Sequence, residues 1–537
     1  MMRITESFAT TVQRLAENDK TLLRISFAKP ETIKKLTASE IIELLAALKL
    51  NTVLEQIDFG GMVFSSDADF EKIIIALNDH PKIQSFGFTE IDNNCIDILN
   101  NKLTKPLKSL NLGILTPDVD PARFSQFLVT CRILRLQELC IEEHIANHLE
   151  SLSQWLSEAD CCLQNLSLVF GDLGDGNVAI AKVLSGNKSL KKLSLEGNLL
   201  QNVGAIVLAK ALETNTTLQS LNLTDNAITA TGGMRLARAL KTNKALTELI
   251  LDGNKLDRSI KQFGDMLAIN VTLQKLSMAR TELRNDKSLI KVLKENKTKL
   301  KTLNLSYNPI SDTLTAEYAK ALQTNTCLEV FILDGITQYY HRYERDKLPT
   351  IKADAFGKML AANQTLKILS LCNNDIDDVS ILPFANGIKS NVSLRELKLN
   401  SNKMISTGVK ALADALDKPS ALAALYLEGE KLEGGAPNAL LRLVQHTPGL
   451  ENFTFLAYKI HKKKFDEAIK NNDTYRKKYR TQFFPKVIEK TTNMLFDPCT
   501  VISGYHEFER YTIEPELLPP DEPKPPGPSL PKKQRIR

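Results

Sequence analysis

The residues best suited to metal chemistry gather in one short stretch of the chain. Cysteine and histidine side chains are the usual ligands of zinc, and the stretch holds Cys131, Cys140, His144, His148, Cys161 and Cys162. Their C-x3-H-x3-H spacing matches no established zinc pattern, and the adjacent Cys161 and Cys162 do not fit a disulfide framework. We therefore predict no metal site, and we expect His144 to make a structural hydrogen bond.

Motifs that would carry catalysis are absent from the sequence. We find no G-x-S-x-G nucleophile elbow, no H-E-x-x-H helix and no G-x-x-x-x-G-K-[ST] phosphate loop. Repeated segments account for most of the 537 residues, so little chain remains for a separate catalytic domain. The sequence predicts a protein that is not an enzyme and that uses no cofactor.

One segment recurs along the chain in the form L-x-x-L-x-L-x-x-N. The clear copies begin at Leu190, Leu218, Leu246, Leu300, Leu366 and Leu394. Weaker copies extend the series toward both ends, the first of them at Leu22. Neighbouring copies start about 28 residues apart, which is a period typical of stacked repeats. The alternating end of the motif predicts a short strand with its leucines on one side, so stacking gives a parallel sheet.

Two sets of asparagines accompany this motif. The first set follows the last leucine, where a buried turn needs a side chain that both donates and accepts; it comprises Asn198, Asn226, Asn254, Asn308, Asn374 and Asn402, and is interrupted by Thr281 and Ile336. The second set precedes the leading leucine, where we expect a left-handed backbone that ends a helix; it comprises Asn187, Asn215, Asn243, Asn270, Asn325, Asn363 and Asn391. Between the two sets, apolar residues recur at helical spacing. Each repeat is therefore predicted as a strand followed by a helix, with the sheet on the concave side.

These features resemble the ribonuclease-inhibitor-like leucine-rich repeats, which are also found in the sensing domains of NOD-like receptors. The run from Asn226 through AITATGGMRLARALKTNKALTELILDGN carries the resemblance, which covers residues 160–450 well and 50–160 loosely. It implies an α/β leucine-rich-repeat solenoid, or horseshoe, with a parallel concave sheet and convex helices. The repeats are not Cys-rich like those of ribonuclease inhibitor, so no binding residue is carried over. The Lys-, Asn- and Ile-rich composition also resembles repeat proteins that intracellular bacteria inject into host cells.

The chain divides into four predicted segments. Residues 1–50 are predicted as an N-terminal helical cap, because the end of a solenoid otherwise exposes its core. Residues 51–450 are predicted as the solenoid, with about 15 repeats. Residues 451–515 form a basic C-terminal cap, since positions 451–490 alone hold 11 Lys or Arg against 5 Asp or Glu. Residues 516–537 form a Pro-rich basic tail that we expect to be disordered.

One column of the strand positions that face the concave side has an acidic character. Glu196, Asp252, Asp334 and Glu428 fall at one position of the concave face, and the column contains no Lys or Arg. Such a column would orient a basic partner and speed its association. It would equally serve as the polar surface that a soluble sheet needs. We expect the partner on this face under either interpretation.

One repeat is longer than its neighbours. Leu328 and Leu366 are 38 residues apart, which places an insertion near 336–350. The insertion carries tyrosines and arginines, which are common in interface hot spots; they are Tyr339, Tyr340, Arg342, Tyr343 and Arg345. Because insertions in repeat arrays map to loops that often border the binding face, this loop is a second candidate contact. The alternative is that its tyrosines pack back on the solenoid.

The C-terminal tail and the composition bear on location. Lys532, Lys533 and Arg535 resemble a short nuclear localisation signal, while the same segment also resembles an SH3 ligand or simple solubility charge. No apolar stretch is long enough to span a bilayer, and the first residues do not resemble a secretory signal. We predict no membrane contact and a cytoplasmic location, which is the host cytoplasm for an injected effector, with the nucleus as the alternative.

The net charge of +6 is concentrated near one end and not along a face, which argues against nucleic acid as the primary ligand. We predict a protein–protein interaction scaffold that binds a partner protein through the concave face and the 336–350 loop. Two alternatives stay open. One is a regulator of an enzyme, such as a small-GTPase activator or an enzyme inhibitor. The other is a nuclear-targeted adaptor that acts through the C-terminal tail.

Overall fold

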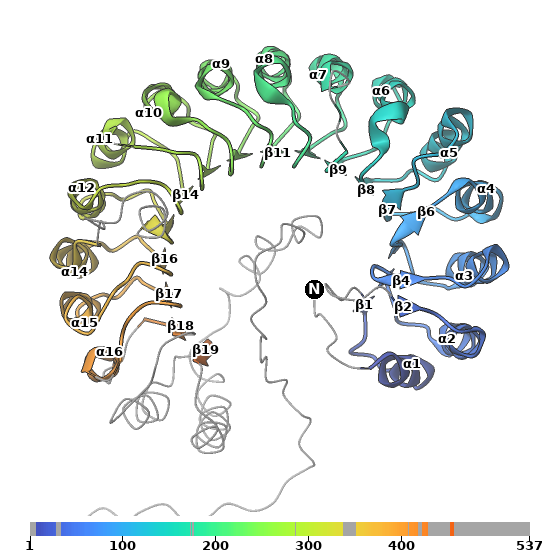
Figure 1. Ribbon diagram of the computed structural model, residues 1–537, viewed down its shortest axis with the longest axis horizontal. Helices are drawn as coiled ribbons and strands as arrows, with labels where there is room; N and C mark the ends of the chain where they lie inside the picture. Colours follow the sequence, from blue (N-terminus) through green and yellow to red (C-terminus); the bar gives the residue numbers. More distant parts are fainter. Residues whose placement is uncertain are drawn as a thin grey trace, which may run out of the picture. The chain divides into compact units, whose positions relative to one another are not determined.

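The computed structural model describes residues 7–27, 34–171, 173, 177–284, 286–336, 351–405, 407–416, 421–427 and 452–455. All of them belong to one compact unit, Met1–Met494. Within this unit a strand, a turn and a helix recur in the order of the predicted repeat. The strands line the inner side of the curve and the helices line its outer side (Figure 1).

The strands form one parallel sheet of 17 members. Each main strand pairs with the one from the next repeat, while β6 lies beside β7. The members are β1 (Arg24–Ser26), β3 (Gln56–Asp58), β5 (Ser85–Gly87), β6 (Glu90–Ile91), β7 (Ser109–Leu115), β8 (Glu138–Glu142), β9 (Asn165–Val169), β10 (Lys192–Ser194), β11 (Ser220–Asn222), β12 (Glu248–Ile250), β13 (Lys275–Ser277), β14 (Thr302–Asn304), β15 (Val330–Ile332), β16 (Ile368–Ser370), β17 (Glu396–Lys398), β18 (Ala424–Leu427) and β19 (Asn452–Phe455). A separate parallel pair joins β2 (Lys34–Lys35) and β4 (Met62–Val63).

Helices connect successive strands on the outer side of the sheet (Figure 1). They are α1 (Phe8–Ala16), α2 (Ala38–Leu50), α3 (Asp67–Asp79), α4 (Asn93–Lys102), α5 (Pro121–Ile133), α6 (Leu149–Ser157), α7 (Asn177–Gly186), α8 (Gln201–Leu212), α9 (Ala230–Leu240), α10 (Ile260–Leu267), α11 (Ser288–Lys294), α12 (Asp312–Leu322), α14 (Ala353–Ala362), α15 (Ile381–Ile388) and α16 (Thr407–Leu416). Short 3₁₀ turns η1 (Ile145–His148) and η3 (Asp257–Ser259) precede α6 and α10. Because a helix is wider than a strand, stacking these units curves the sheet inward. The predicted fold class is confirmed.

The core runs between the two layers as ladders of aliphatic side chains. Leu193, Leu221 and Leu249 are aligned in register on β10, β11 and β12, and all three are fully buried or nearly so. In the first repeats phenylalanine fills comparable space, with Phe59 and Phe88 stacked 6.0 Å apart between ring centroids. Because each ladder crosses from repeat to repeat, burial of these side chains is what ties neighbouring units together.

The sheet begins earlier than the predicted solenoid. Strand β1 lies within residues 1–50, the segment predicted as a helical cap, and it pairs with β3. That segment therefore contains a repeat strand in addition to α1 and α2. The weak motif copy at Leu22 leads into this strand. At the other end, β19 extends the sheet into the predicted basic cap. The remainder of that cap, the tail 516–537 and residues 337–350 lie outside the described residues.

The first set of asparagines forms the predicted buried ladder. Asn226 donates through Nδ2 to the carbonyl of Leu195 at 2.7 Å, and its Oδ1 accepts from the backbone N–H of Asn198 at 3.1 Å. The interruption at Thr281 retains part of this function, because its hydroxyl donates to the carbonyl of Met278 at 2.7 Å. The ladder thus satisfies backbone groups at the inward turn, where water cannot reach them.

The second set of asparagines caps the repeats by a different means from the one predicted. Asn363 follows α14 with φ −77°, so a left-handed backbone is the wrong explanation. The side chains act instead. In Asn187, Oδ1 accepts from the N–H groups of Ser189 at 3.0 Å and Leu190 at 2.7 Å, while Nδ2 donates to the carbonyl of Leu156 at 2.7 Å. This set is therefore a second buried ladder. It lies where the strands begin, whereas the first ladder lies where they end.

Candidate protein-binding face

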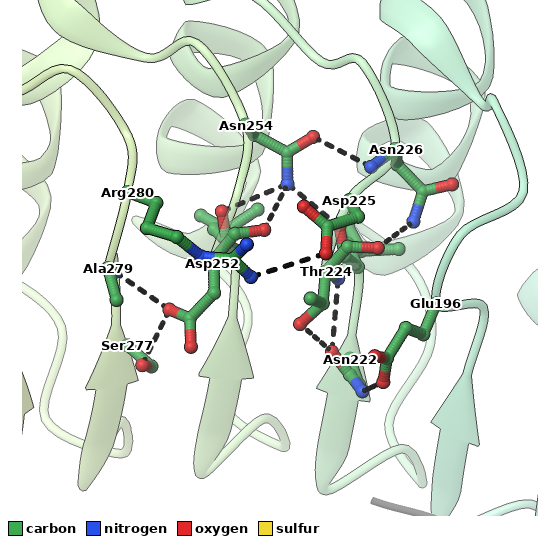
Figure 2. A network of polar contacts seen from close by, with 12 residues as sticks. Glu196, Asn222, Thr224, Asp225, Asn226, Asp252, Asn254, Ser277, Ala279 and Arg280 are labelled. Carbon is green, nitrogen blue, oxygen red and sulfur yellow. Dashed lines mark hydrogen bonds and ion pairs between the residues drawn. The ribbon is translucent and has the colours of Figure 1, made fainter. Parts of the chain in front are cut away.

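The predicted acidic column lies where the strands end, and its side chains are largely used inside the stack. Asp252 accepts through Oδ1 from the hydroxyl of Ser277 at 2.6 Å and from the N–H of Ala279 at 2.8 Å (Figure 2). Asp334, three repeats further along the chain, accepts in the same way from the hydroxyl of Ser370 at 2.7 Å and from the N–H of Cys372 at 2.8 Å. These carboxylates cap the next repeat. They are not simply exposed on the concave surface.

Glu196 is buried and accepts from Nδ2 of Asn222 at 3.1 Å (Figure 2). Burial removes water from each carboxylate, and this raises the pKa values of Glu196, Asp252 and Asp334 above those of exposed carboxyl groups. Their hydrogen bonds lower the pKa values again, but by less than burial raises them. Glu428, the fourth member of the predicted column, lies outside the described residues.

A second column follows the first by one residue, and its backbone is left-handed throughout. We call it the left-handed column; its members are Glu143, Phe170, Gly197, Asp225, Gly253, Arg280, Tyr307, Gly335, Asn373 and Ser401, with φ between 50° and 73°. Each of the two columns presents one residue per repeat at the end of the strands. The sequence reveals this position through its glycines, but left-handed geometry at the other members was not predicted.

The glycines of the left-handed column make room for the large side chains beside them. Asp225 lies over Gly253 and reaches Arg280 two repeats on, with 3.3 Å between the carboxylate and the guanidinium (Figure 2). Tyr307 lies over Gly335 in the same way, and its hydroxyl accepts from Asn373 Nδ2 at 3.3 Å. A Cβ at either glycine would overlap the covering side chain. The column is therefore a packed row, with Arg280 and Tyr307 partly exposed.

An apolar strip interrupts the polar inner face at β15 and β16. Val330 and Ile368 are paired in register, Ile332 lies two residues along β15, and all three are half-buried on the face opposite the core. We call these residues the concave apolar patch. Tyr307 follows β14, and its ring covers Gly335, which lies three residues beyond the end of β15. The signal in the sequence was the apolar run from Val330 to Leu333, since most of the other strands alternate apolar with polar residues.

The other candidate residues are not brought into one site. Cys131, Cys140 and His148 are buried. His144 is exposed, and among the described residues its one polar partner is Glu143 at 3.8 Å, so the structural hydrogen bond predicted for His144 is not formed there. In the described part of the chain, no group of three His, Cys, Asp or Glu side chains is placed to hold a metal ion. The candidate loop and tail residues lie outside the described ranges; they are Tyr339, Tyr340, Arg342, Tyr343, Arg345, Lys532, Lys533 and Arg535.

Comparison with known proteins supports the fold. A family model described as Leucine Rich repeat matches residues 186–209, 214–237, 296–313, 362–385 and 390–413. The chain carries leucine-rich repeats. Each matched stretch contains one or both of the asparagine ladder positions, so the family match and the observed hydrogen bonds identify the same repeating unit.

Solved structures show similar folds at low identity. The leiomodin-1 actin-binding site 2 is 15% identical, with a TM-score of 0.26, covering 37% of this chain and 95% of that one. The tropomodulin C-terminal domain of Caenorhabditis elegans is 16% identical, with a TM-score of 0.25, covering 36% and 97%. A chain of the yeast Rad7 and Elc1 complex structure is 18% identical, with a TM-score of 0.43, covering 69% and 84%. These values are too low to carry an argument about a partner.

None of the helices in the described ranges is both long and apolar enough to cross a membrane. Three surfaces of the described residues stand out: the concave apolar patch, the left-handed column and the carboxylates of the acidic column. All three lie on the inner side or at the strand ends of the leucine-rich repeats.

Proposed function

We propose that this protein is a non-enzymatic scaffold that binds a partner protein on the inner face of its leucine-rich repeats. The observation that carries the proposal is the concave apolar patch, Val330, Ile332 and Ile368, with Tyr307 at its border. Elsewhere this face is built mainly of Ser, Asn, Thr and charged side chains. Aliphatic and aromatic side chains surrounded by a polar rim are the usual centre of a protein interface.

The strand-end carboxylates would set the orientation of that partner: Asp334 lies two residues after Ile332, and Asp252 lies three repeats earlier on the same face. Asp252 and Asp334 each use Oδ1 for their internal hydrogen bonds, and in the described residues Oδ2 receives none. Their raised pKa values reflect a negative charge that the protein compensates incompletely. A lysine or arginine of the partner would relieve this desolvation. We therefore propose a partner with an apolar side chain flanked by basic residues.

Affinity capture with matched variants tests this proposal. Val330→Ser with Ile368→Ser removes the patch but introduces a residue type already common on the inner face. The control is Val129→Ser with Ile133→Ser on the outer helix α5, where the two side chains are 37% and 71% exposed. Each aliphatic side chain buried by a partner contributes about 1.5–3 kcal/mol, so the patch variant should bind at least tenfold more weakly.

The expected result is a partner retained by the wild type and by the control and lost from the patch variant, with all three proteins melting alike. Equal capture by the wild type, the control and the patch variant would overturn the proposal. The injected-effector origin, the ribonuclease-inhibitor-like subtype, the enzyme-regulator role, the nuclear adaptor role and the cytoplasmic location stay predictions from the sequence.

A further inference from the structure

A second surface with the properties of a binding site lies on the outer layer, away from the inner face. Helices α9 and α10 are neighbours there (Figure 1) and border a groove of about 480 Å³. The groove is lined by Thr231, Met234, Arg235, Arg238, Lys241 and Gln262. Five of these residues come from α9 and the turn after it, and Gln262 comes from α10.

The groove is strongly basic, and its positive charges are not compensated. Arg235, Arg238 and Lys241 follow one another at intervals of three, which places them on the same face of α9. They are exposed, and none of the three forms an ion pair with a carboxylate in the described residues. Exposed lysines elsewhere do find such partners, as Lys367 does with Glu329 at 2.6 Å. Like charges at this spacing repel each other, so an anionic ligand would stabilise the groove.

Gln262 adds a feature that distinguishes one kind of anion from another. Its Oε1 is buried and has no hydrogen-bond partner among the described residues. Because the Gln262 side chain lines the groove, a small rotation would present this oxygen to a ligand. A buried acceptor without a donor is costly, and an N–H group from a ligand would satisfy it. Phosphate and polyphosphate present acceptor oxygens along their whole surface, whereas a peptide presents backbone N–H donors beside carboxylates. Met234, in the same groove, offers an apolar contact that suits a peptide.

We propose that the α9–α10 groove binds an acidic peptide segment of a partner protein. Side-chain carboxylates of the segment contact Arg235, Arg238 and Lys241, and a backbone N–H donates to Gln262 Oε1. Because helices form the outer layer and strands the inner one, this site lies apart from the concave apolar patch (Figure 1). The protein can then hold two protein surfaces at once, and the groove binds its ligand whether or not the inner face has a partner.

The probe for this site is a fluorescein-labelled hexaglutamate peptide, and linear polyphosphate of the same charge is the comparison ligand. Binding is measured by fluorescence anisotropy on the full chain. Arg235→Glu with Arg238→Glu reverses two charges in the groove. Lys291→Glu with Lys294→Glu makes the same change in net charge on α11. We expect hexaglutamate affinity to fall at least tenfold in the first variant and less than about twofold in the second.

Gln262→Leu separates a peptide site from a general anion site, because it removes the acceptor without changing the charge. It should weaken hexaglutamate binding several-fold and leave polyphosphate binding unchanged. Two results overturn the proposal. One is an equal loss of hexaglutamate affinity in both charge variants, which would reflect net charge alone. The other is insensitivity of hexaglutamate to Gln262→Leu together with tighter binding of polyphosphate. Circular dichroism melting of each variant checks that the repeats remain folded.

Discussion

Replacing His80 by asparagine should remove an acid-sensitive element from the stack without weakening it at neutral pH. His80 lies three residues before Ile83, the position that asparagines occupy in later repeats. It is 4% exposed, and its Nδ1 accepts from the N–H groups of Lys82 and Ile83, both at 3.2 Å. An asparagine Oδ1 makes the same two bonds elsewhere in the ladder, as Asn187 does.

The sign and size of the effect follow from the position of the proton. Protonation of Nδ1 would point an N–H at two other N–H groups, and the resulting cation would be buried near Lys105. Desolvation, followed by the charge of Lys105, lowers the pKa of His80 from 6.5 to about 4. A pKa depressed by folding gives stability that is present above pH 6.5 and is lost as the pH falls to about 4. The loss amounts to about 2–3 kcal/mol.

Urea unfolding followed by circular dichroism at pH 7.5 and pH 4.5 measures this difference. Hydrogen exchange at Lys82 and Ile83 supplies a local readout for a repeat protein that need not unfold in one step. The wild type and His80→Asn should be similarly stable at pH 7.5, and the variant should be more stable at pH 4.5. His144→Asn, at an exposed position, is the control and should show no such gain. A difference between wild type and His80→Asn that does not change with pH would refute the reasoning.

Two further predictions concern the strand-end turns. Gly335→Ala should destabilise the protein by about 2 kcal/mol or more, because a Cβ costs about 1–2 kcal/mol in the left-handed region and also overlaps the Tyr307 ring. Adding Tyr307→Ala should recover the steric part of this loss in a double-mutant cycle. Additive free-energy changes for the two substitutions would contradict the contact between Gly335 and Tyr307. Asn226→Ala should cost about 3–5 kcal/mol by stranding buried backbone groups, whereas Asn226→Thr should cost clearly less, as the hydroxyl of Thr281 shows. Equal urea midpoints for these two variants would count against this explanation.

The repeating part of the fold could be predicted from the sequence because it is local and periodic. The alternating leucines give the strand, and a fixed period brings Leu193, Leu221 and Leu249 into register. The same alignment identified Thr281 as a break in the first asparagine ladder. The mechanism of the second ladder was not predictable in this way. The partner of Asn187 Nδ2 is a carbonyl 31 residues earlier, and only the stacked structure brings the two together.

The contacts of the strand-end columns required the structure for a related reason. A sequence shows glycine at 253 and 335, but it does not show that Asp225 and Tyr307 fill the space above them. That contact depends on whether the side chain from the preceding repeat points along the column toward the glycine. The long-range pairs that follow, such as Arg280 with Asp225, connect residues 55 positions apart.

The acidic column illustrates why composition alone is a weak guide to a binding surface in a stacked fold. Every residue at the end of a strand has backbone donors of the next repeat beside it, so a carboxylate there is useful to the stack before any partner binds. Asp252 and Asp334 use Oδ1 for bonds inside the stack, and the proposed partner would supply a cation for Oδ2. An aliphatic side chain on the concave face forms no hydrogen bond with the next repeat, and its exposed part stays in water until a partner covers it. Val330 and Ile368 therefore indicate a partner more directly than the charged residues of the acidic column.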